Sequence, residues 1–393
     1  MSIHGGTALI VLSLIPASAL AQDPKPHTPA FKKTHIDKKF RSEGVTTADV
    51  DGDGKKDILA GPLWYQAPDW KARELAPVKE FDPLKGYSES FCCFTDDLNG
   101  DGRPELIVVD FPGTPVWVHE NPGKDKLDGH WNRHQAFPSC SNESPTYLDL
   151  DGDGKREMIC GFLPERRMAW FSPGSIADPW TCHPLSGPNA PGTQAFDHGL
   201  GLGDVNKDGR LDVITRNGWY EAPGDRKSPD WPFHEASLGE PCAQMYALDL
   251  DGDGDQDVLS SSAHQFGIWW YEQEKKDDGK TAWTRHEIDK SYSQTHSLML
   301  ADLNKDGMVD FVTGRRWMAH MGGDPEEKDG KPAVLYWYEL SKKDGKPAWN
   351  RHLIDEDSGV GTQFELTDMN GDGLVDIVIS NKKGVFYFEH TKA

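Results

Sequence analysis

The 393-residue sequence predicts an all-β protein built from a repeated unit of four strands, and three observations lead to this prediction. An acidic loop motif recurs seven times along the chain. Runs of β-branched residues follow these loops, and most of the runs lead into an aromatic segment. Repeats with a period of roughly 50 residues are typical of folds in which similar units are arrayed next to one another.

The loop motif first appears between Asp49 and Asp57, as Asp-Val-Asp-Gly-Asp-Gly-Lys-Lys-Asp. Side-chain oxygens occupy positions 1, 3, 5 and 9, and glycine occupies position 6, where the chain turns sharply. This arrangement suits a hard cation with six or more oxygen ligands, and calcium is the natural occupant. Acidic turns without a cation would leave the identical offsets in seven places unexplained. The sequence therefore predicts up to seven structural Ca²⁺ sites.

The predicted calcium ligands are Asp49, Asp51, Asp53, Asp57, Asp97, Asn99, Asp101, Glu105, Asp149, Asp151, Asp153, Glu157, Asp204, Asn206, Asp208, Asp212, Asp249, Asp251, Asp253, Asp257, Asp302, Asn304, Asp306, Asp310, Asp368, Asn370, Asp372 and Asp376. An EF-hand is excluded, because it needs a glutamate at position 12 and flanking helices. Position 12 is instead a residue such as Ala60 or Cys160. Because β-branched runs such as Phe311-Val-Thr313 follow the loops, each loop is expected to join the first and second strands of a unit.

The third strand of the unit is aromatic, as in Leu335-Tyr-Trp-Tyr338, and the fourth carries Trp and His, as in Trp349-Asn-Arg-His352. Four-stranded units in a radial array form a β-propeller, and seven copies predict a seven-bladed one. The last unit stops at His390 without a fourth strand, while Phe31 to Asp37 reads as an isolated fourth strand. We therefore expect the N-terminal strand to complete the last blade and close the ring.

The charge and hydropathy of the chain limit which binding partners and which cellular locations are expected. The chain has 42 Lys and Arg against 64 Asp and Glu, and its net charge of −22 argues against nucleic acid as a partner. No segment approaches the ~18 apolar residues of a membrane span. The short apolar run Ala8 to Leu14, followed by Ala19-Leu-Ala21, predicts a signal peptide at 1–21. The rest, 22–393, is expected to be a single propeller that is secreted or periplasmic, with the pairing of its six cysteines left open.

The loops and their flanking strands resemble FG-GAP/VCBS repeats of integrin-type propellers, and the resemblance extends from Phe31 to His390. It implies a calcium-binding propeller and says little about activity. The Trp-x-x-His strand, Thr-His296-Ser-Leu, and the run Thr313-Gly-Arg-Arg316 followed by His320 resemble more narrowly the propeller domain of aldos-2-ulose dehydratase, a sugar lyase. This second resemblance implies a carbon–oxygen lyase, although the cupin domains of the fungal enzyme have no counterpart here.

Differences between the repeats indicate where a functional site lies. Histidines such as His234 and His352 recur at one place in the outer strand and are expected to be structural. The position six residues before each loop and the turn after the second strand vary from repeat to repeat, and both should face the axial funnel. The predicted catalytic residues there are His198, His296, His264, His320, Arg216, Arg315 and Glu143.

Imidazole can act as a base or bind a divalent metal, and arginine can hold a carboxylate or stabilise an enolate. These are the groups that β-elimination from a keto-sugar requires, so one hypothesis is a lyase or dehydratase. The alternative is a non-catalytic propeller that binds carbohydrate or protein at the cell surface. A further divalent metal in the funnel is left open. The insertion Met318 to Lys331 is a lid, a recognition loop or a solvated surface loop.

Overall fold

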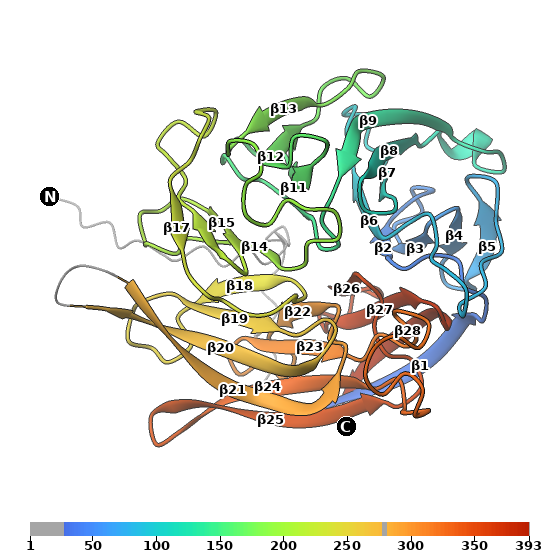
Figure 1. Ribbon diagram of the computed structural model, residues 1–393. Coiled ribbons are helices and arrows are strands. Elements are labelled where there is room, and N and C mark those ends of the chain that lie inside the picture. The colour runs from blue at the N-terminus through green and yellow to red at the C-terminus, as the bar shows by residue number, and fades with distance from the viewer. Residues whose placement is uncertain (1–26, 277–280, 393) are drawn as a thin grey trace, which may run out of the picture.

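The computed structural model describes residues 27–276 and 281–392, so the predicted signal peptide lies outside the described residues. Within those ranges the chain forms 28 strands and one short 3₁₀ helix, η1 (Lys124–Lys126). The sheets lie around a common centre, as the blades of a propeller do (Figure 1). The all-β propeller fold predicted from the sequence is confirmed. No helix in the described part of the chain has the length and apolar character that a membrane span requires.

Five sheets contain four strands each. The first is β2 (Thr46–Ala48), β3 (Asp57–Ala60), β4 (Leu63–Gln66) and β5 (Lys71–Glu74). The second is β6 (Cys92–Asp96), β7 (Glu105–Val109), β8 (Thr114–Glu120) and β9 (Asn132–Cys140). The third is β10 (Thr146–Leu148), β11 (Glu157–Phe162), β12 (Arg167–Ser172) and β13 (Thr181–Pro184). The fourth is β22 (Leu298–Ala301), β23 (Asp310–Gly314), β24 (Leu335–Lys343) and β25 (Lys346–Asp355). The fifth is β26 (Phe364–Thr367), β27 (Asp376–Asn381), β28 (Gly384–Lys392) and β1 (Pro29–Asp37).

The prediction of seven separate blades is wrong, because only five four-stranded blades are separate and the other eight strands form one sheet. This sheet contains β14 (Leu200–Gly203), β15 (Asp212–Thr215), β16 (Gly218–Tyr220), β17 (Phe233–Glu235), β18 (Met245–Leu248), β19 (Asp257–Ser261), β20 (Phe266–Lys275) and β21 (Thr281–Ser293). Strands β14 and β18 pair in parallel, with Gly201 opposite Met245. A Cβ atom at Gly201 would lie 2.1 Å from the Met245 carbonyl oxygen, and one at Gly203 would lie 2.3 Å from the Ala247 Cβ. The two glycines therefore let the backbones approach closely enough to join the sheets.

The N-terminal strand β1 pairs with β28 in antiparallel register, from Pro29 opposite Lys392 to Asp37 opposite Val385. It is thus the outer strand of the sheet that β26, β27 and β28 begin (Figure 1). On the inner side, β26 contacts both β22 and β2. The two ends of the described chain therefore lie in one sheet.

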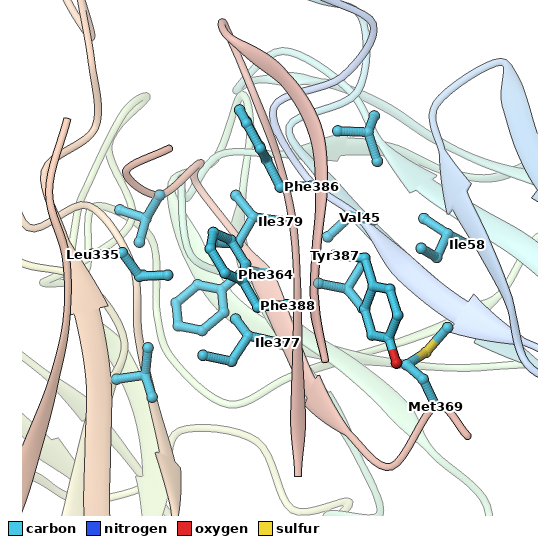
Figure 2. Close-up of a cluster of buried hydrophobic side chains, with 14 of the residues drawn as sticks. Val45, Ile58, Leu335, Phe364, Met369, Ile377, Ile379, Phe386, Tyr387 and Phe388 are labelled. Atoms are coloured by element: carbon cyan, nitrogen blue, oxygen red, sulfur yellow. The ribbon is translucent and has the colours of Figure 1, made fainter. Parts of the chain in front are cut away.

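Apolar side chains fill the spaces between neighbouring sheets. In one cluster, Phe364 and Ile377 of the last sheet lie between Leu335 of the preceding sheet and Val45 and Ile58 of the first (Figure 2). All five side chains are almost fully buried. Burying an apolar side chain of this size contributes roughly 1.5–3 kcal/mol, so the sheets form a rigid support for the residues at the centre. All six cysteines are free thiols, and all but Cys182 are buried.

Candidate functional site

The residue six positions before each loop is buried in every repeat, although its type varies. These residues are Glu43, Phe91, Glu143, His198, Ala243, His296 and Thr362. Some of their contacts join strands that are not neighbours in a sheet. The Gln244 side-chain amide, for example, donates to the Thr362 carbonyl oxygen at 3.3 Å. The inner ends of the strands therefore converge on one polar centre.

Four histidines lie together at this centre, namely His198, His264, His296 and His320. Their ring centroids are 4.5 to 5.7 Å apart in the five pairs that are in contact. One ring nitrogen from each of His198, His264 and His296 lies within 4.8 Å of the other two. These residues come from the segments before β14, after β19 and before β22, so the fold brings together side chains that are distant in sequence.

Three of these imidazoles are oriented through Nδ1. The Asp324 carboxylate oxygen Oδ2 accepts from Nδ1 of His264 at 3.2 Å and from Nδ1 of His320 at 2.6 Å. The Phe196 carbonyl oxygen lies 2.7 Å from Nδ1 of His198 and accepts its proton. A proton held on Nδ1 of His264 and His320 leaves Nε2 as the free ring nitrogen, which is the arrangement that second-shell acceptors create around metal-binding histidines. Nε2 of His198 instead faces the Glu143 carboxylate.

His296 differs from the other three, because neither of its ring nitrogens has a hydrogen-bond partner among the residues that the structure describes. The side chain is buried, and burial, followed by the positive charge of Arg316, holds the pKa of His296 well below its usual range. An unsatisfied buried polar group costs about 1–3 kcal/mol. A neutral imidazole with a free lone pair therefore faces the cluster at a cost that a bound ligand would offset.

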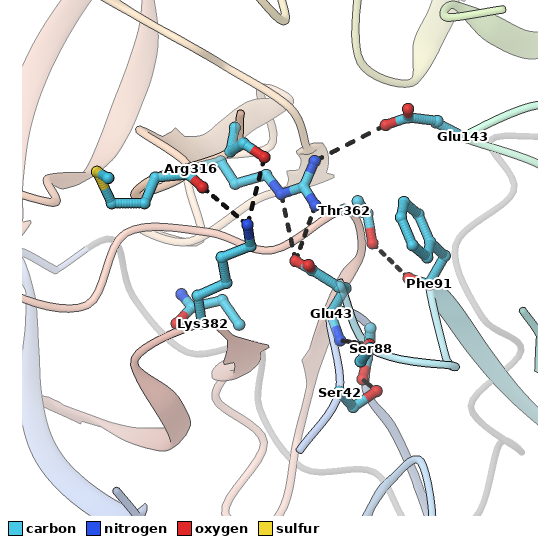
Figure 3. A network of polar contacts seen from close by, with 12 residues as sticks. Ser42, Glu43, Ser88, Phe91, Glu143, Arg316, Thr362 and Lys382 are labelled. Atoms are coloured by element: carbon cyan, nitrogen blue, oxygen red, sulfur yellow. Dashed lines mark hydrogen bonds and ion pairs between the residues drawn. The ribbon is translucent and has the colours of Figure 1, made fainter. Parts of the chain in front are cut away.

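An ion-pair network around Arg316 adjoins the histidines, and Figure 3 shows Arg316 between Glu43 and Glu143. Arg316 is fully buried and contacts Glu43 at 2.9 Å and Glu143 at 3.7 Å. Glu143 also lies 3.3 Å from Nε2 of His198. Burial raises the pKa of Glu143, but the charges of His198 and Arg316 outweigh it and lower that pKa to about 2. Burial lowers the pKa of His198, and the Glu143 carboxylate more than reverses this, so the net pKa is raised.

A cavity of about 430 Å³ opens onto the cluster. Its polar lining comes from Glu143, Asp197, His198, Arg216, His264 and His320. Its apolar lining comes from Tyr87, Phe91, Phe111, Phe196 and Pro241. Polar groups that converge on one side of an aromatic-walled cavity are typical of small-molecule sites. We call this space the funnel cavity.

The structure brings most of the predicted catalytic residues together, but not Arg315. His198, His264, His320, Glu143 and Arg216 line the funnel cavity, and His296 lies in ring contact with three of them. Arg315 pairs with Glu326 at 2.6 Å and donates to the Pro332 carbonyl oxygen at 3.0 Å, so it anchors the insertion that follows β23. Its neighbour Arg316 is the arginine that reaches the centre.

Sequence reasoning missed Asp324, which lies in the insertion 318–331 and was read only as part of a lid or an acidic surface loop. Its signal was its place four residues after His320, in the one long insertion that carries a non-repeating histidine. The aromatic walls Tyr87, Phe111 and Phe196 were also missed. Tyr87 and Phe196 lie in segments between the repeats, where the periodic pattern gives no guidance, and Phe111 lies in the turn between β7 and β8.

The seven acidic loops share one backbone geometry. The glycine at position 6 has a positive φ, between 81° and 96°, in every loop, which agrees with the sharp turn expected there. Three carboxylates lie within 4.8 Å of one another in three loops. These groups are Asp49, Asp51 and Asp53; Asp149, Asp151 and Glu157; and Asp249, Asp251 and Asp253. Clustered carboxylate oxygens of this kind fit a calcium ion.

The carboxylate at position 9 has a structural task in every loop. It is buried and accepts the backbone N–H of position 2, at distances of 2.8 to 3.2 Å. Burial raises the pKa of this group, to about 7 for Asp57 and about 6 for Asp310. The residue at position 9 thus ties the loop to the second strand, a role that the sequence pattern did not distinguish from cation binding.

The model of the FG-GAP-like repeat matches this chain at residues 97–160 and 249–313. Each match begins at the first aspartate of one loop and ends just after the next loop, at Cys160 and Thr313. The chain is therefore a β-propeller with FG-GAP-like repeats, as the sequence indicated. No curated relative matches the sequence.

Several solved structures have a similar fold. An Agrocybe aegerita lectin that recognises non-reducing terminal N-acetylglucosamine is 14% identical, with 93% of this chain and 86% of the lectin covered and a TM-score of 0.43. The rhamnogalacturonan lyase YesW is 13% identical, with 95% and 74% covered and a TM-score of 0.45. The extracellular domain of the putative one-component system BT4673 of B. thetaiotaomicron is 11% identical, with 91% and 39% covered and a TM-score of 0.49. Similarities this distant assign neither a ligand nor a reaction.

Proposed function

We propose that the protein is a secreted, calcium-stabilised propeller that catalyses β-elimination from a keto-sugar or a related saccharide in the funnel cavity. One observation carries the proposal: four imidazoles converge beside the funnel cavity, and one carboxylate, Asp324, orients two of them. A solvated polar funnel without chemistry has no use for buried histidines whose ring nitrogens lack partners.

A divalent transition metal fits the nitrogen atoms of His198, His264 and His296. Imidazole nitrogens suit zinc and its neighbours, and the buried unpartnered nitrogens of His296 are the group that a metal would satisfy. When bound, such a metal polarises the ketone oxygen of the substrate and stabilises the negative charge that develops there. Binding of a cation would displace the proton that Glu143 favours on His198.

His320 is then the base. Asp324 holds its Nδ1, and its side chain lines the cavity, so Nε2 of His320 can accept the proton from the carbon next to the ketone. The carbon–oxygen bond at the next carbon breaks as the double bond forms. The same imidazolium returns its proton to the departing oxygen, so water or an alcohol leaves and His320 is neutral again.

The proposal is tested by an ultraviolet absorbance assay of the mature protein against keto-sugars, anhydro-sugars and polyuronates, because elimination creates a conjugated chromophore. We expect a signal in the wild type that His320→Ala lowers by roughly 100-fold or more, since general acid–base groups contribute about 10²–10⁴-fold. The matched outer-strand variant His352→Ala should keep full activity. Silence across the whole panel would favour the non-catalytic binding propeller, and glycan-array binding would then identify its ligand.

Calcium in the acidic loops is proposed as a structural cofactor. The grouped carboxylates of three loops and the shared glycine geometry support this role. Removal of calcium with a chelator should lower the melting temperature by about 5 °C or more, because a ligand that binds only the folded state stabilises it. Re-addition of calcium, but not of zinc, should restore the melt. An unchanged melt in excess chelator would contradict the proposal.

A further inference from the structure

A second, more open cavity adjoins the funnel cavity. It has a volume of about 730 Å³ and runs along the loop between β13 and β14, the turn after β15, and the end of β17. Asp197 and Arg216 line both cavities. The two spaces therefore adjoin each other at these two side chains. We call the second space the side groove.

The side groove is lined by groups that suit a neutral sugar. Gln194, Asn217 and Ser237 supply amide and hydroxyl groups, Glu235 supplies a carboxylate acceptor, and Phe233 supplies an aromatic ring. Such groups hydrogen-bond to hydroxyls, while an aromatic ring packs against the C–H face of a pyranose. Glu235 and Asp197 together with the net charge of −22 disfavour a polyanionic chain.

Arg216 stands at the junction with free hydrogen-bonding capacity. Its Nε has no partner, and its nearest carboxylate, Asp197, lies 3.8 Å away. The guanidinium is thus positioned between the two cavities without a close ion pair. It can donate to the oxygen that links a sugar in the funnel cavity to a sugar in the side groove.

The wall of the side groove is held in place by buried side chains. The Asn142 amide donates to the Gly192 carbonyl oxygen at 2.9 Å, and the Tyr220 hydroxyl donates to that of Pro191 at 2.8 Å. Asn189 and Phe196, which flank this wall, have positive φ values of 59° and 65°. Non-glycine residues rarely adopt this conformation, and it persists only where the surrounding contacts enforce it. The groove is therefore preformed.

We infer that the substrate is a neutral oligosaccharide, whose reacting unit occupies the funnel cavity and whose neighbouring units occupy the side groove. This inference rests on the proposed function for the identity of the reacting unit. It adds that a chain of at least two sugars, rather than a free monosaccharide, is the preferred ligand.

The test measures binding without turnover. Neutral mono-, di-, tri- and tetrasaccharides of glucose, galactose and mannose, together with galacturonate oligomers, are titrated calorimetrically into the wild-type protein in calcium. We expect the affinity for one neutral series to rise at least tenfold from the monosaccharide to the trisaccharide, and no comparable gain for galacturonates. Affinity that does not depend on chain length, or no binding in any series, would overturn the inference.

Two groove variants and one control locate the effect. Asn217→Ala and Phe233→Ala should lower trisaccharide affinity by roughly 5-fold or more and leave monosaccharide affinity unchanged, since one lost polar or packing contact costs about 1 kcal/mol. Asn217 is exposed, so its variant folds even if Phe233→Ala does not. Asn132→Ala, at an exposed position on β9, is the matched control. Retained trisaccharide affinity in Asn217→Ala would contradict the inference.

These experiments can contradict the proposed lyase activity and the proposed oligosaccharide binding independently of each other. Binding that depends on saccharide length, without any elimination product, would contradict the proposed lyase and support the inference about the side groove. Elimination from monosaccharides and trisaccharides with equal kcat/KM would support the proposed lyase and contradict the inference about the side groove.

Discussion

The inner and outer ends of the sheets use the same residue type in opposite ways. On the outer strands, His234 stacks on Trp219 with ring centroids 4.2 Å apart, and its Nε2 lies 2.7 Å from Glu221. His352 repeats this arrangement on Trp337, at 4.2 Å. At the centre, His264 and His296 contact other imidazoles instead, with ring centroids 5.2 Å apart.

The two groups of histidines therefore differ in their stacking and hydrogen-bonding partners and not in residue type. An outer histidine is satisfied by one aromatic face and one acceptor from its own sheet, so every repeat can use it. Inner histidines come from different repeats and leave ring nitrogens free, which no scaffold requires. A comparison of the repeats therefore separates scaffold histidines from candidate functional ones within a single sequence.

The largest effect is expected where the buried charges behind the inner histidines are broken. Arg316→Met leaves the fully buried Glu43 carboxylate without its partner, so unfolding should become about 3–5 kcal/mol easier. Lys32→Met, which breaks a mostly exposed pair with Glu389, should cost less than about 1 kcal/mol. Urea unfolding compares the two variants, and equal losses would mean that the central pair is not the strong contact described.

Removal of an inner histidine should greatly weaken metal binding. His296→Ala takes away the imidazole with two unpartnered nitrogens, and the affinity for Zn²⁺ in saturating calcium should fall by roughly 100-fold or more. His286→Ala on the outer strand β21 should leave that affinity unchanged. Zinc titration by calorimetry distinguishes the outcomes, and similar affinities in both variants would remove the distinction between inner and outer histidines.

A smaller effect is expected at Asp324, whose carboxylate accepts from Nδ1 of His264 and of His320 and is proposed to orient His264 for the metal. Asp324→Asn should weaken zinc binding by about 10–100-fold, the usual cost of losing a second-shell carboxylate. Asp329→Asn, at an exposed position of the same insertion, is the matched control. Unaltered zinc affinity in Asp324→Asn would show that the carboxylate does not orient His264 for a metal.

The smallest effect is expected at the outer strands. His286 stacks on Trp270 at 4.4 Å and contacts Glu272 at 2.6 Å, so His286→Ala should cost roughly 1 kcal/mol of stability. Elimination activity should stay within about twofold of the wild type. A large loss of activity without a loss of stability would assign the outer histidines a function.

Much of the fold could be predicted from the sequence, because the residues that favour the strands and the turn lie within each repeat. The positive φ of the loop glycines and the pairing of β1 with β28 agree with that reading. The parallel pairing of β14 with β18 could not be predicted, because it depends on a close approach between the backbones of two repeats at Gly201 and Gly203. A glycine in one strand does not reveal which backbone will come near it.

The inner histidines could be found by comparing repeats, whereas their partners could not. Arg315 and Arg316 are adjacent in sequence, yet one anchors the insertion and the other reaches the centre. The direction of each arginine side chain depends on how the chain bends at the end of β23, and the sequence alone does not show this bend. Asp324 lies in a segment with no counterpart in the other repeats, so no periodicity could place it against His264.

The most direct test of a metal centre built from inner histidines is X-ray absorption spectroscopy at the zinc K edge, on protein loaded with one equivalent of Zn²⁺ in saturating calcium. The account predicts the scattering pattern of three imidazoles, with zinc–nitrogen distances of about 2.0–2.1 Å. A first shell of oxygen atoms alone would place the zinc in the acidic loops and contradict the account.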